Sequence, residues 1–237
     1  MSDITVVIPC YTLNDEIQKL TEQSIESVGT GPLILIDNAS PMGGGYLRSK
    51  ATTYIRNSEN LGYAKAVNQG IILAKTRYVA VTETDVRVSP NWREIASKVL
   101  KEPNTFSCHF RMTEYDVPFV YGKSIVYNGK ERWCSAPFFV LDKEKELLFD
   151  EDFFNSFEDW DYFFRARQKG YNTAYTDMAC FQHMHSFTQR FVQFKGTEEN
   201  RKIFIQKHKI DPDRLLAQMY PDQMLINYNE GFNIEQH

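Results

Sequence analysis

Cysteine is sparse in this 237-residue sequence, and its spacing excludes the usual metal and redox motifs. The four cysteines, Cys10, Cys108, Cys134 and Cys180, are scattered and form no CxxC pair. A chain of this length buries roughly 70% of its unfolded surface, so it needs no disulfide or structural metal to fold. Each cysteine stands beside apolar or aromatic residues, which predicts buried free thiols in a reducing compartment.

Long hydrophobic runs and targeting signals are also missing. The N-terminus, MSDITVVIPC, has no basic segment followed by an extended apolar stretch, so it does not resemble a signal peptide. No apolar run approaches the roughly 18 residues that a membrane span needs. We therefore expect a soluble cytoplasmic protein, and peripheral contact with a membrane stays open.

An excess of basic residues is absent as well. The chain has 27 Lys and Arg against 31 Asp and Glu, a formal net charge of -4. This balance disfavours nucleic acid as a partner, because such binding needs a broad basic footprint. Aromatic residues, in contrast, reach 14%, which predicts an aromatic core, a surface that stacks flat rings, or both.

Short apolar runs alternate with helical patterns over the first hundred residues. This alternation predicts an α/β fold with a mostly parallel sheet and helices on both faces. Ligands of such sheets bind beyond the carboxyl ends of the strands. Polar groups stand at three predicted strand ends, Cys10–Tyr11, Asp37–Asn38 and Glu83–Asp85. The predicted strands are Ile4–Ile8, Leu33–Ile36, Thr53–Arg56 and Tyr78–Thr82, and the predicted helices are Asp15–Val28, Tyr63–Ala74 and Asn91–Leu100.

The second half has a different pattern but no linker or repeat, so we expect one mixed α/β domain. Asn128-Gly129 is a strong hairpin-turn signal, and Gly170 is a plausible residue to end a helix. The predicted elements are a hairpin at Lys123–Trp133, a buried run at Ala136–Leu141, a helix at Glu158–Lys169, a strand at Ala179–His185 and a helix at Thr197–His208.

Two polar clusters have the composition of a metal site. Glu83 and Asp85 follow a buried strand, and two carboxylates so placed can hold a divalent cation against phosphate oxygens. His183 and His185 fall on one face of a predicted strand, and imidazole is a good ligand for manganese. The structural alternatives are a solvated acidic turn and two hydrogen-bonded histidines near a strand end.

Glu158 and Asp159 open a predicted helix and are candidates for a general base. A hydroxyl that attacks carbon at neutral pH needs a base, and a carboxylate beside an apolar wall has the raised pKa that suits it. The alternative is structural, because acids are favoured in the first turn of a helix and Asp161 can pair with Arg165 four residues on. The wall would come from Phe138, Phe157 and Trp160.

Other motifs are weaker. The Asn60-Leu61-Gly62 segment precedes a helix and offers backbone N–H groups to an anion, or it is a simple loop with a helix cap. Gly43-Gly44-Gly45 matches neither GxxxxGK[ST] nor GxGxxG, so a flexible connection is expected. No Ser or Cys stands in a recognisable nucleophile elbow, and nothing else in the sequence suggests acyl transfer.

Taken together, the motifs resemble the family 2 glycosyltransferases, which are inverting enzymes of the GT-A fold. The first half has, in order, TVVIPCY, LILIDNAS, RNSENLGYAKAVNQGI and YVAVTETDVRVSPNW. The second half continues with SAPFFVL, FDEDFFNSFEDWDYFFRARQKGY and a strand that ends in histidine. The resemblance covers about residues 4–188 and does not extend to residues 189–237. Glu83 is a departure, because the family has Asp at the first position of its D-x-D strand end.

The resemblance implies a division of the single domain, 1–237, into three parts. Residues 1–100 would be the nucleotide-binding half, 101–188 the acceptor and catalytic half, and 189–237 a C-terminal helical extension. It also implies a divalent cation, Mn²⁺ or Mg²⁺, bound by Asp85 and completed by His183 or His185. The implied donor-binding residues are Pro9, Tyr11 and Asp37 for the base and ribose, Asn60, Gly62 and Lys65 near the nucleotide or diphosphate, and Glu83, whose contact the departure leaves open.

The implied reaction moves a sugar from a nucleotide-diphosphate sugar to a hydroxyl of a glycan or another acceptor. Asp159 would be the base, with Glu158 beside it, and the acceptor side would be shaped by Ala136, Pro137, Phe138 and Trp160. Two alternatives stay open: a sugar nucleotidylyltransferase, which would need a Gly-rich basic loop where this chain has CYTLNDE, and a non-catalytic sugar-nucleotide-binding protein. The patterns distinguish neither the sugar nor the acceptor.

Overall fold

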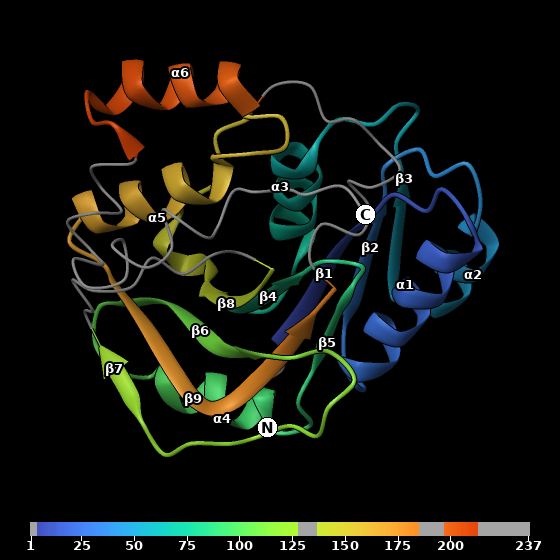
Figure 1. Cartoon of the computed structure of the whole chain (residues 1–237), viewed down its shortest axis with the longest axis horizontal. Helices are drawn as coiled ribbons and strands as arrows, with labels where there is room; N and C mark the ends of the chain where they lie inside the picture. The colour runs from blue at the N-terminus through green and yellow to red at the C-terminus, as the bar shows by residue number, and fades with distance from the viewer. Residues whose placement is uncertain (1–3, 128–136, 185–196, 213–237) are drawn as a thin grey trace, which may run out of the picture.

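The computed structural model of the chain describes residues 4–127, 137–184 and 197–212, and these build one mixed sheet flanked by helices (Figure 1). The strands are β1 (Ile4–Cys10), β2 (Leu33–Asp37), β3 (Thr53–Arg56), β4 (Tyr78–Thr82), β5 (Val86–Val88), β6 (Thr105–Thr113), β7 (Ile125–Tyr127), β8 (Phe138–Asp142) and β9 (Asn172–His183).

The sheet is mostly parallel, as the alternating pattern predicts. Its order is β3-β2-β1-β4-β8-β6-β9-β5, with β7 paired to β9. Strands β1 to β4 run parallel, and β6 and β9 run parallel to each other. Strand β8 lies antiparallel between β4 and β6, and β5 lies antiparallel to β9. The first and second halves of the chain therefore share one sheet.

Helices cover both faces of the sheet because the buried strands are apolar on both sides. On β1, Val6 and Ile8 pack with the cluster that contains α1, α2 and α4, whereas Val7 packs with the cluster that contains α3 and α5. The sixth helix, α6, lies outside α5 (Figure 1) and contacts it through a separate aromatic cluster. The helices are α1 (Asp15–Ser27), α2 (Gly44–Lys50), α3 (Tyr63–Leu73), α4 (Trp92–Val99), α5 (Glu158–Gln168) and α6 (Thr197–His208).

Close packing of α3 on β1 depends on a missing side chain. A Cβ atom at Gly70 would lie 2.2 Å from Cγ1 of Val7. Glycine at this position therefore lets α3 approach the centre of the sheet, and the residues that begin α3 reach the carboxyl ends of the strands. At the other face, α1 begins as predicted, with Asn14 Oδ1 accepting the N–H of Ile17 at 2.9 Å.

Several sequence expectations change in the structure. The Gly43–Gly45 run is not a flexible connection, because α2 begins at Gly44. Strand β6 was not predicted, and β9 begins at Asn172 rather than Ala179. The segment expected to form the first arm of a hairpin includes β7, which pairs with β9. The Asn128-Gly129 turn lies outside the described residues.

Cys10, Cys108 and Cys180 are buried free thiols, as predicted, and Cys134 lies outside the described residues. Among the described helices, none combines the length and the apolar character that a membrane crossing requires.

Candidate functional site

Three titratable side chains from two distant parts of the chain meet beyond the end of β4. Glu83 follows β4, and Asp85 precedes β5. Strand β5 pairs with β9 so that Val86 stands opposite His183. His183 Nε2 lies 3.4 Å from Glu83 Oε2 and 3.4 Å from Asp85 Oδ1. The expected meeting of Asp85 with one of the two histidines is therefore present, through His183, and Glu83 joins them; we call these three residues the triad.

The backbone around the triad is tied to its neighbours on several sides. The N–H of Glu83 donates to the carbonyl of Pro137 at 3.1 Å, and Ser24 Oγ donates to the carbonyl of Glu83 at 2.9 Å. The N–H of Met184 donates to the carbonyl of Asp85 at 3.1 Å. The turn that presents the carboxylates is thus fixed by hydrogen bonds to α1, to the residue before β8 and to the residue after β9.

The charges of the triad are strongly coupled. Burial alone lowers the pKa of His183, but the hydrogen bonds and negative charges of Asp85 and Glu83 outweigh it and raise that pKa to about 10. The low-dielectric surroundings raise the pKa of Glu83, although part of its side chain still reaches solvent. In the absence of a metal, the positive charge between the two carboxylates is that of the protonated His183 imidazole.

The donor set of the triad fits a divalent cation. One imidazole nitrogen and two carboxylate oxygens can be chosen that all lie within 4.8 Å of one another. Manganese accepts imidazole and carboxylate ligands together. Three protein ligands leave coordination positions for oxygens of a bound molecule. This geometry assigns Glu83, whose contact the sequence left open, as a candidate ligand beside Asp85 and His183, and His185 lies outside the described residues.

A second pair of carboxyl groups begins α5 near the triad. Burial first, and then the charges of Asp159 and Glu83, raise the pKa of Glu158 well above its ordinary value. Glu158 Oε2 is buried and has no hydrogen-bond partner among the described residues. Burial therefore favours the neutral form of Glu158, in surroundings that it shares with Glu83 from the other half of the chain.

Tyr63, the first residue of α3, belongs to the same site and was not predicted from the sequence. Its pKa is raised well above the ordinary value by burial, and next by the charges of Glu83, Glu158 and Asp159. Its hydroxyl therefore stands among carboxyl groups from β4 and α5. The only sequence signal for it was an aromatic hydroxyl directly after Gly62, at the start of a predicted helix.

The Asn60–Gly62 loop does not offer its backbone N–H groups to an anion. Three successive N–H groups already have acceptors within the protein: Leu61 donates to Asn38 Oδ1 at 3.0 Å, Gly62 to Asn60 Oδ1 at 2.9 Å and Tyr63 to Phe154 O at 2.9 Å. The alternative, a loop with a helix cap, describes this segment, and the anion-binding expectation for these N–H groups is wrong. Lys65 is exposed one turn into α3.

Asp37 lies at the end of β2, next to the end of β1. Cys10 stands opposite Asp37 in the register of these strands, which places Pro9 and Tyr11 beside the same edge. The Asp37 carboxylate is fully buried and accepts hydrogen bonds from the Ser40 N–H at 2.8 Å, from the Tyr54 hydroxyl at 2.5 Å and from the Arg56 guanidinium. Burial by itself raises the pKa of Asp37, but these hydrogen bonds outweigh it and lower the pKa.

The residues expected on the acceptor side separate into three groups. Phe138 is only 1% exposed and stacks on Phe110 with ring centroids 4.9 Å apart, in the cluster on the opposite face of the sheet from α5. The prediction that its side chain shapes the acceptor side, or walls the α5 carboxylates, is therefore wrong. Pro137 contacts the triad through its carbonyl, Trp160 lies on α5, and Ala136 is outside the described residues.

Solved structures with a similar fold include complexes with nucleotides and nucleotide sugars. The chain is similar to a crystal structure of S. aureus TarS 1-349, with a TM-score of 0.65 and 13% identity over 99% of this chain and 75% of that one. TarS structures in complex with UDP and with UDP-GlcNAc also match.

The chain is also similar to the mannosyltransferase PcManGT from Pyrobaculum calidifontis in complex with GDP-Man and Mn²⁺, with a TM-score of 0.63 and 16% identity over 92% of this chain and 69% of that one. At these identities the likeness shows the fold, and the prediction of a GT-A fold is confirmed.

Sequence comparison gives an independent result. Among curated proteins, no sequence matches this chain significantly. A family model described as Glycosyl transferase family 2 matches residues 5–172, which include β1 at one end and α5 at the other.

Proposed function

We propose a reaction for this chain from one premise: it belongs to glycosyl transferase family 2 and is a glycosyltransferase. The proposed reaction moves a sugar from a nucleotide-diphosphate donor to an acceptor hydroxyl and inverts the anomeric configuration. The observation that carries it is the convergence of the triad with Glu158 and Asp159 at one end of the sheet. One cluster fits a diphosphate and its cation, and the other supplies a base.

The donor is proposed to lie across the ends of β1, β2 and β4. TarS and PcManGT, which share the fold, bind UDP-GlcNAc and GDP-Man in their solved structures. In this chain, Pro9, Tyr11 and Asp37 stand together at one side of that edge. We assign the base and ribose to Pro9 and Tyr11, and the buried Asp37 carboxylate is proposed to hold that edge in place through Ser40, Tyr54 and Arg56. Lys65 is exposed in the first turn of α3, and we assign its positive charge to attracting the diphosphate of the donor.

The triad is proposed to hold the diphosphate end of the donor. A divalent cation, Mn²⁺ or Mg²⁺, held by Asp85, His183 and Glu83 would neutralise the negative charge that develops on the leaving diphosphate. Asp85 is 6% exposed, and its carbonyl accepts the N–H of Met184 at 3.1 Å, so its backbone is held beside the end of β9. Glu83 retains more solvent contact and can adjust to the ligand.

Asp159 is proposed as the base that takes the proton from the acceptor hydroxyl. The hydroxyl oxygen then attacks the anomeric carbon from the face opposite the leaving diphosphate, and this single displacement inverts the configuration. Burial raises the pKa of Glu158, which favours the neutral form of its carboxyl, the form that donates a hydrogen bond. We therefore assign the base to Asp159, and Glu158 is proposed to orient the acceptor by donating a hydrogen bond.

A transfer assay with conservative variants tests this assignment. Asp159→Asn keeps the size of the side chain and removes the proton acceptor, so transfer should fall by about 100- to 10,000-fold. Binding of the nucleoside diphosphate, measured by calorimetry with Mn²⁺ present, should stay near the wild-type affinity. Asp152→Asn is the matched control, because Asp152 is an exposed acid just before α5.

Two results would overturn the proposal. Retention of more than about a tenth of wild-type turnover by Asp159→Asn, under conditions where chemistry limits the rate, would exclude Asp159 as the base. A wild-type protein that binds nucleotide sugars but neither hydrolyses nor transfers them would be a binding protein. A nucleotidylyltransferase would instead form nucleotide sugar from a sugar phosphate and a nucleoside triphosphate, which the same preparation can be assayed for.

A further inference from the structure

We propose that α6 is a positioning clamp for the catalytic end of α5. This inference rests on the proposed function, because it concerns how Glu158 and Asp159 are held. Helix α6 follows the residues that the family model matches, so membership of the family assigns it no role. Figure 1 places α6 as an outer layer over α5, with α5 between it and the sheet. Three separate contacts join α6 to α5 or to the residues just before it, and each lies close to Glu158 and Asp159 in the chain.

The first contact fixes the backbone just before α5. Asn200 of α6 is 4% exposed, and its Nδ2 donates to the carbonyl of Ser156 at 3.1 Å and to Ser156 Oγ at 3.0 Å. Ser156 is two residues before Glu158. Moving Ser156 away from Asn200 would leave the buried amide without either acceptor, so the two hydrogen bonds help to fix the position of Ser156.

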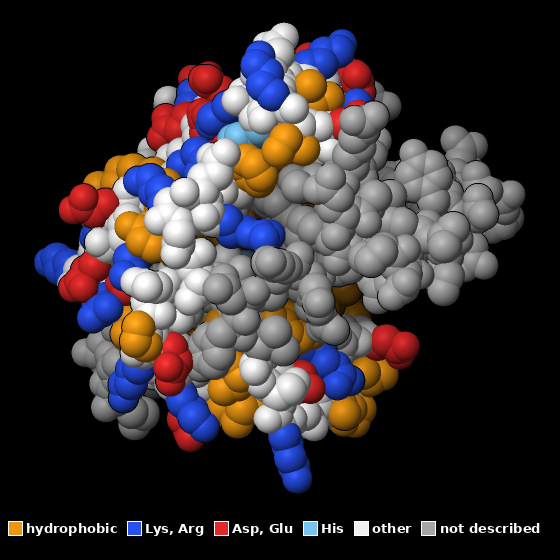
Figure 2. Space-filling model, turned by 90° about the vertical axis from the view of Figure 1, so that its left-hand side faces the viewer, with side chains coloured by type: hydrophobic (Ala, Val, Ile, Leu, Met, Phe, Trp, Pro, Cys, Tyr) orange, Lys and Arg blue, Asp and Glu red, His pale blue; other side chains and the backbone are white. Residues whose placement is uncertain are grey.

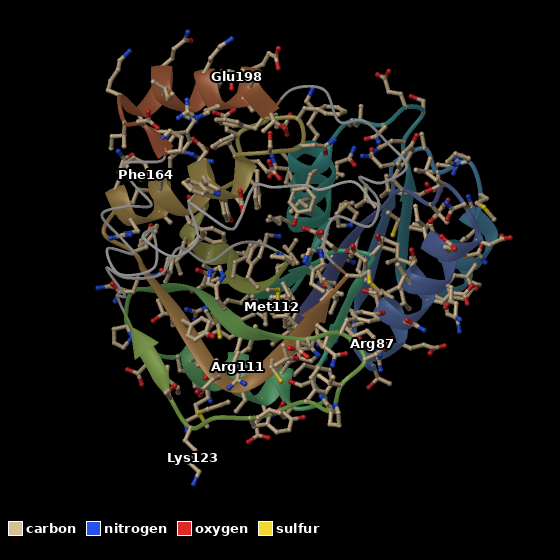
Figure 3. All side chains as sticks on the ribbon, in the orientation of Figure 1. Arg87, Arg111, Met112, Lys123, Phe164 and Glu198 are labelled. Atoms are coloured by element: carbon tan, nitrogen blue, oxygen red, sulfur yellow. The ribbon has the colours of Figure 1, made fainter. Side chains whose placement is uncertain are left out.

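The second contact is an aromatic cluster around Phe204. Phe204 is fully buried, and its ring centroid lies 6.0 Å from that of Phe157, 6.4 Å from that of Trp160 and 6.1 Å from that of Phe164. Figure 3 shows Phe164 on the side of α5 that faces α6. Phe157 and Trp160 directly flank Glu158 and Asp159 in the sequence. The single side chain of Phe204 therefore contacts a residue on each side of this pair.

The third contact is a buried carboxylate with cationic partners from both helices. Asp161 is fully buried and accepts from Arg165 Nε at 2.6 Å, which is the pairing predicted from the sequence. Lys207 Nζ lies 2.7 Å from Asp161 Oδ1, and His208 Nε2 lies 2.8 Å from the same oxygen. Asp161 is two residues after Asp159, and α6 supplies two of its three partners.

The start of α5 needs such external support because its own cap is poor. Phe157 is the N-cap residue, has a left-handed φ of 63° and makes no side-chain capping hydrogen bond in the described structure. A helix start without a capping side chain is less stable than one with a good cap. The segment that leads into α5 is also held by α3. Asn68 Nδ2 donates to the carbonyl of Phe149 at 2.9 Å, and the N–H of Phe149 donates to Asn68 Oδ1 at 2.9 Å.

The outer face of α6 has no part in this clamp. Glu198, Glu199 and Lys202 are exposed, and Figure 3 shows Glu198 on the side of α6 away from α5. Figure 2 shows charged side chains of both signs at the top of the molecule, where α6 lies. The helix therefore presents a charged surface to solvent and its clamping side chains, Asn200, Phe204, Lys207 and His208, to α5 and the segment before it.

The test uses two variants that remove different contacts and one that restores a contact. Asn200→Ala and His208→Ala should each lower kcat for transfer by about 10- to 100-fold, because a displacement of about 1 Å at a reacting group costs this much. The affinity for nucleoside diphosphate with Mn²⁺ should change by less than about twofold, since α6 supplies no donor residue. His208→Gln keeps an N–H donor at a similar reach and should recover most of the kcat, and the control Glu198→Gln should behave as wild type.

Amide hydrogen exchange of the full-length variants provides a readout that does not depend on transfer. The clamp predicts faster exchange over residues 156–161 in Asn200→Ala and His208→Ala, with unchanged exchange in β1 and β4. Unaltered exchange over 156–161, or a lower melting temperature with unchanged kcat, would show that α6 only adds stability and would overturn the inference. Equal losses of kcat and donor affinity would overturn it too. If the wild-type protein transfers no sugar, the proposed function fails, and the exchange data alone decide on the clamp.

Discussion

Gly62 stands where a side chain cannot be accommodated, so replacing it with alanine should destabilise the protein. Gly62 precedes α3 with φ 82° and ψ 172°, a region that is essentially restricted to glycine. A Cβ atom there would lie 2.5 Å from the carbonyl oxygen of Phe154 and 2.7 Å from its ring. The same carbonyl accepts the N–H of Tyr63 at 2.9 Å, so moving it away would cost that hydrogen bond.

The size of the effect follows from these two contributions. A non-glycine residue in this backbone region costs on the order of 1–3 kcal/mol. Forcing a methyl group into a closely packed contact costs about 1–3 kcal/mol more. The total, about 2–6 kcal/mol, is a large part of the 5–15 kcal/mol by which a typical domain is stable. For a chain of this length, each kcal/mol lowers the melting temperature by roughly 2–4 °C.

Urea unfolding followed by far-ultraviolet circular dichroism, together with a thermal melt, measures this loss. Gly45→Ala is the matched control, because Gly45 lies in α2 and a Cβ atom there would have nothing within 4 Å. Alanine should leave this helix as stable or more stable by about 0.5–1 kcal/mol. If Gly62→Ala melted within about 2 °C of wild type, the contact with Phe154 would not be tight and the reasoning would fail.

Three further predictions concern the triad and the packing of α3. Asp85→Ala should abolish the Mn²⁺-dependent part of nucleoside diphosphate binding in calorimetry while the protein still melts cooperatively, and unchanged affinity with Mn²⁺ would contradict the assignment. The fold raises the pKa of His183 from about 6.5 to about 10, so in metal-free protein its stabilising contribution is complete below about pH 6.5 and is lost as the pH rises toward 10. His183→Gln should flatten this part of the stability curve in urea unfolding, whereas a wild-type curve without any such decline would refute the prediction. Gly70→Ala should cost about 1–3 kcal/mol, and adding Val7→Ala should recover part of it by making room, so purely additive losses would argue against the contact.

The central strands could be predicted because their burial is uniform. Strands β2 and β4 are buried at every residue, so their sequences are continuous apolar runs that few other structures produce. Strand β6 escaped prediction for the opposite reason. Ser107 and His109 are polar but buried in it, and Ser107 Oγ lies 2.9 Å from His109 Nε2. A pattern of apolar residues cannot reveal polar groups that pair inside the core.

Helix α2 shows another limit of local patterns. Three glycines at its start disfavour a helix by intrinsic propensity. Leu47 is nevertheless 1% exposed and packs with the core cluster of that face, so burial rather than propensity stabilises the helix. Such tertiary stabilisation is not visible in a short window of sequence.

The sequence predicted the site residues that stand at the ends of strands. It did not predict the contacts that form only when helices pack together. Glu83, Asp85 and His183 were identified because polar residues at the ends of apolar runs are conspicuous. The contacts of Asp161 with Lys207 and His208 join two helices, and no spacing within either helix encodes them. The pairing of Asp161 with Arg165 was predicted, because four residues along a helix return to the same side.

Because β5 pairs with β9, the triad can be completed only late in the synthesis of the chain. Both carboxylates of the triad leave the ribosome with the first half of the sheet, whereas the imidazole arrives only with the last strand. Contacts between such distant parts of a chain form slowly, because a long loop must close first. A ribosome-bound fragment that stops before β9 thus has two acidic side chains without their partner, and a cation held by all three can be captured only once the sheet has closed.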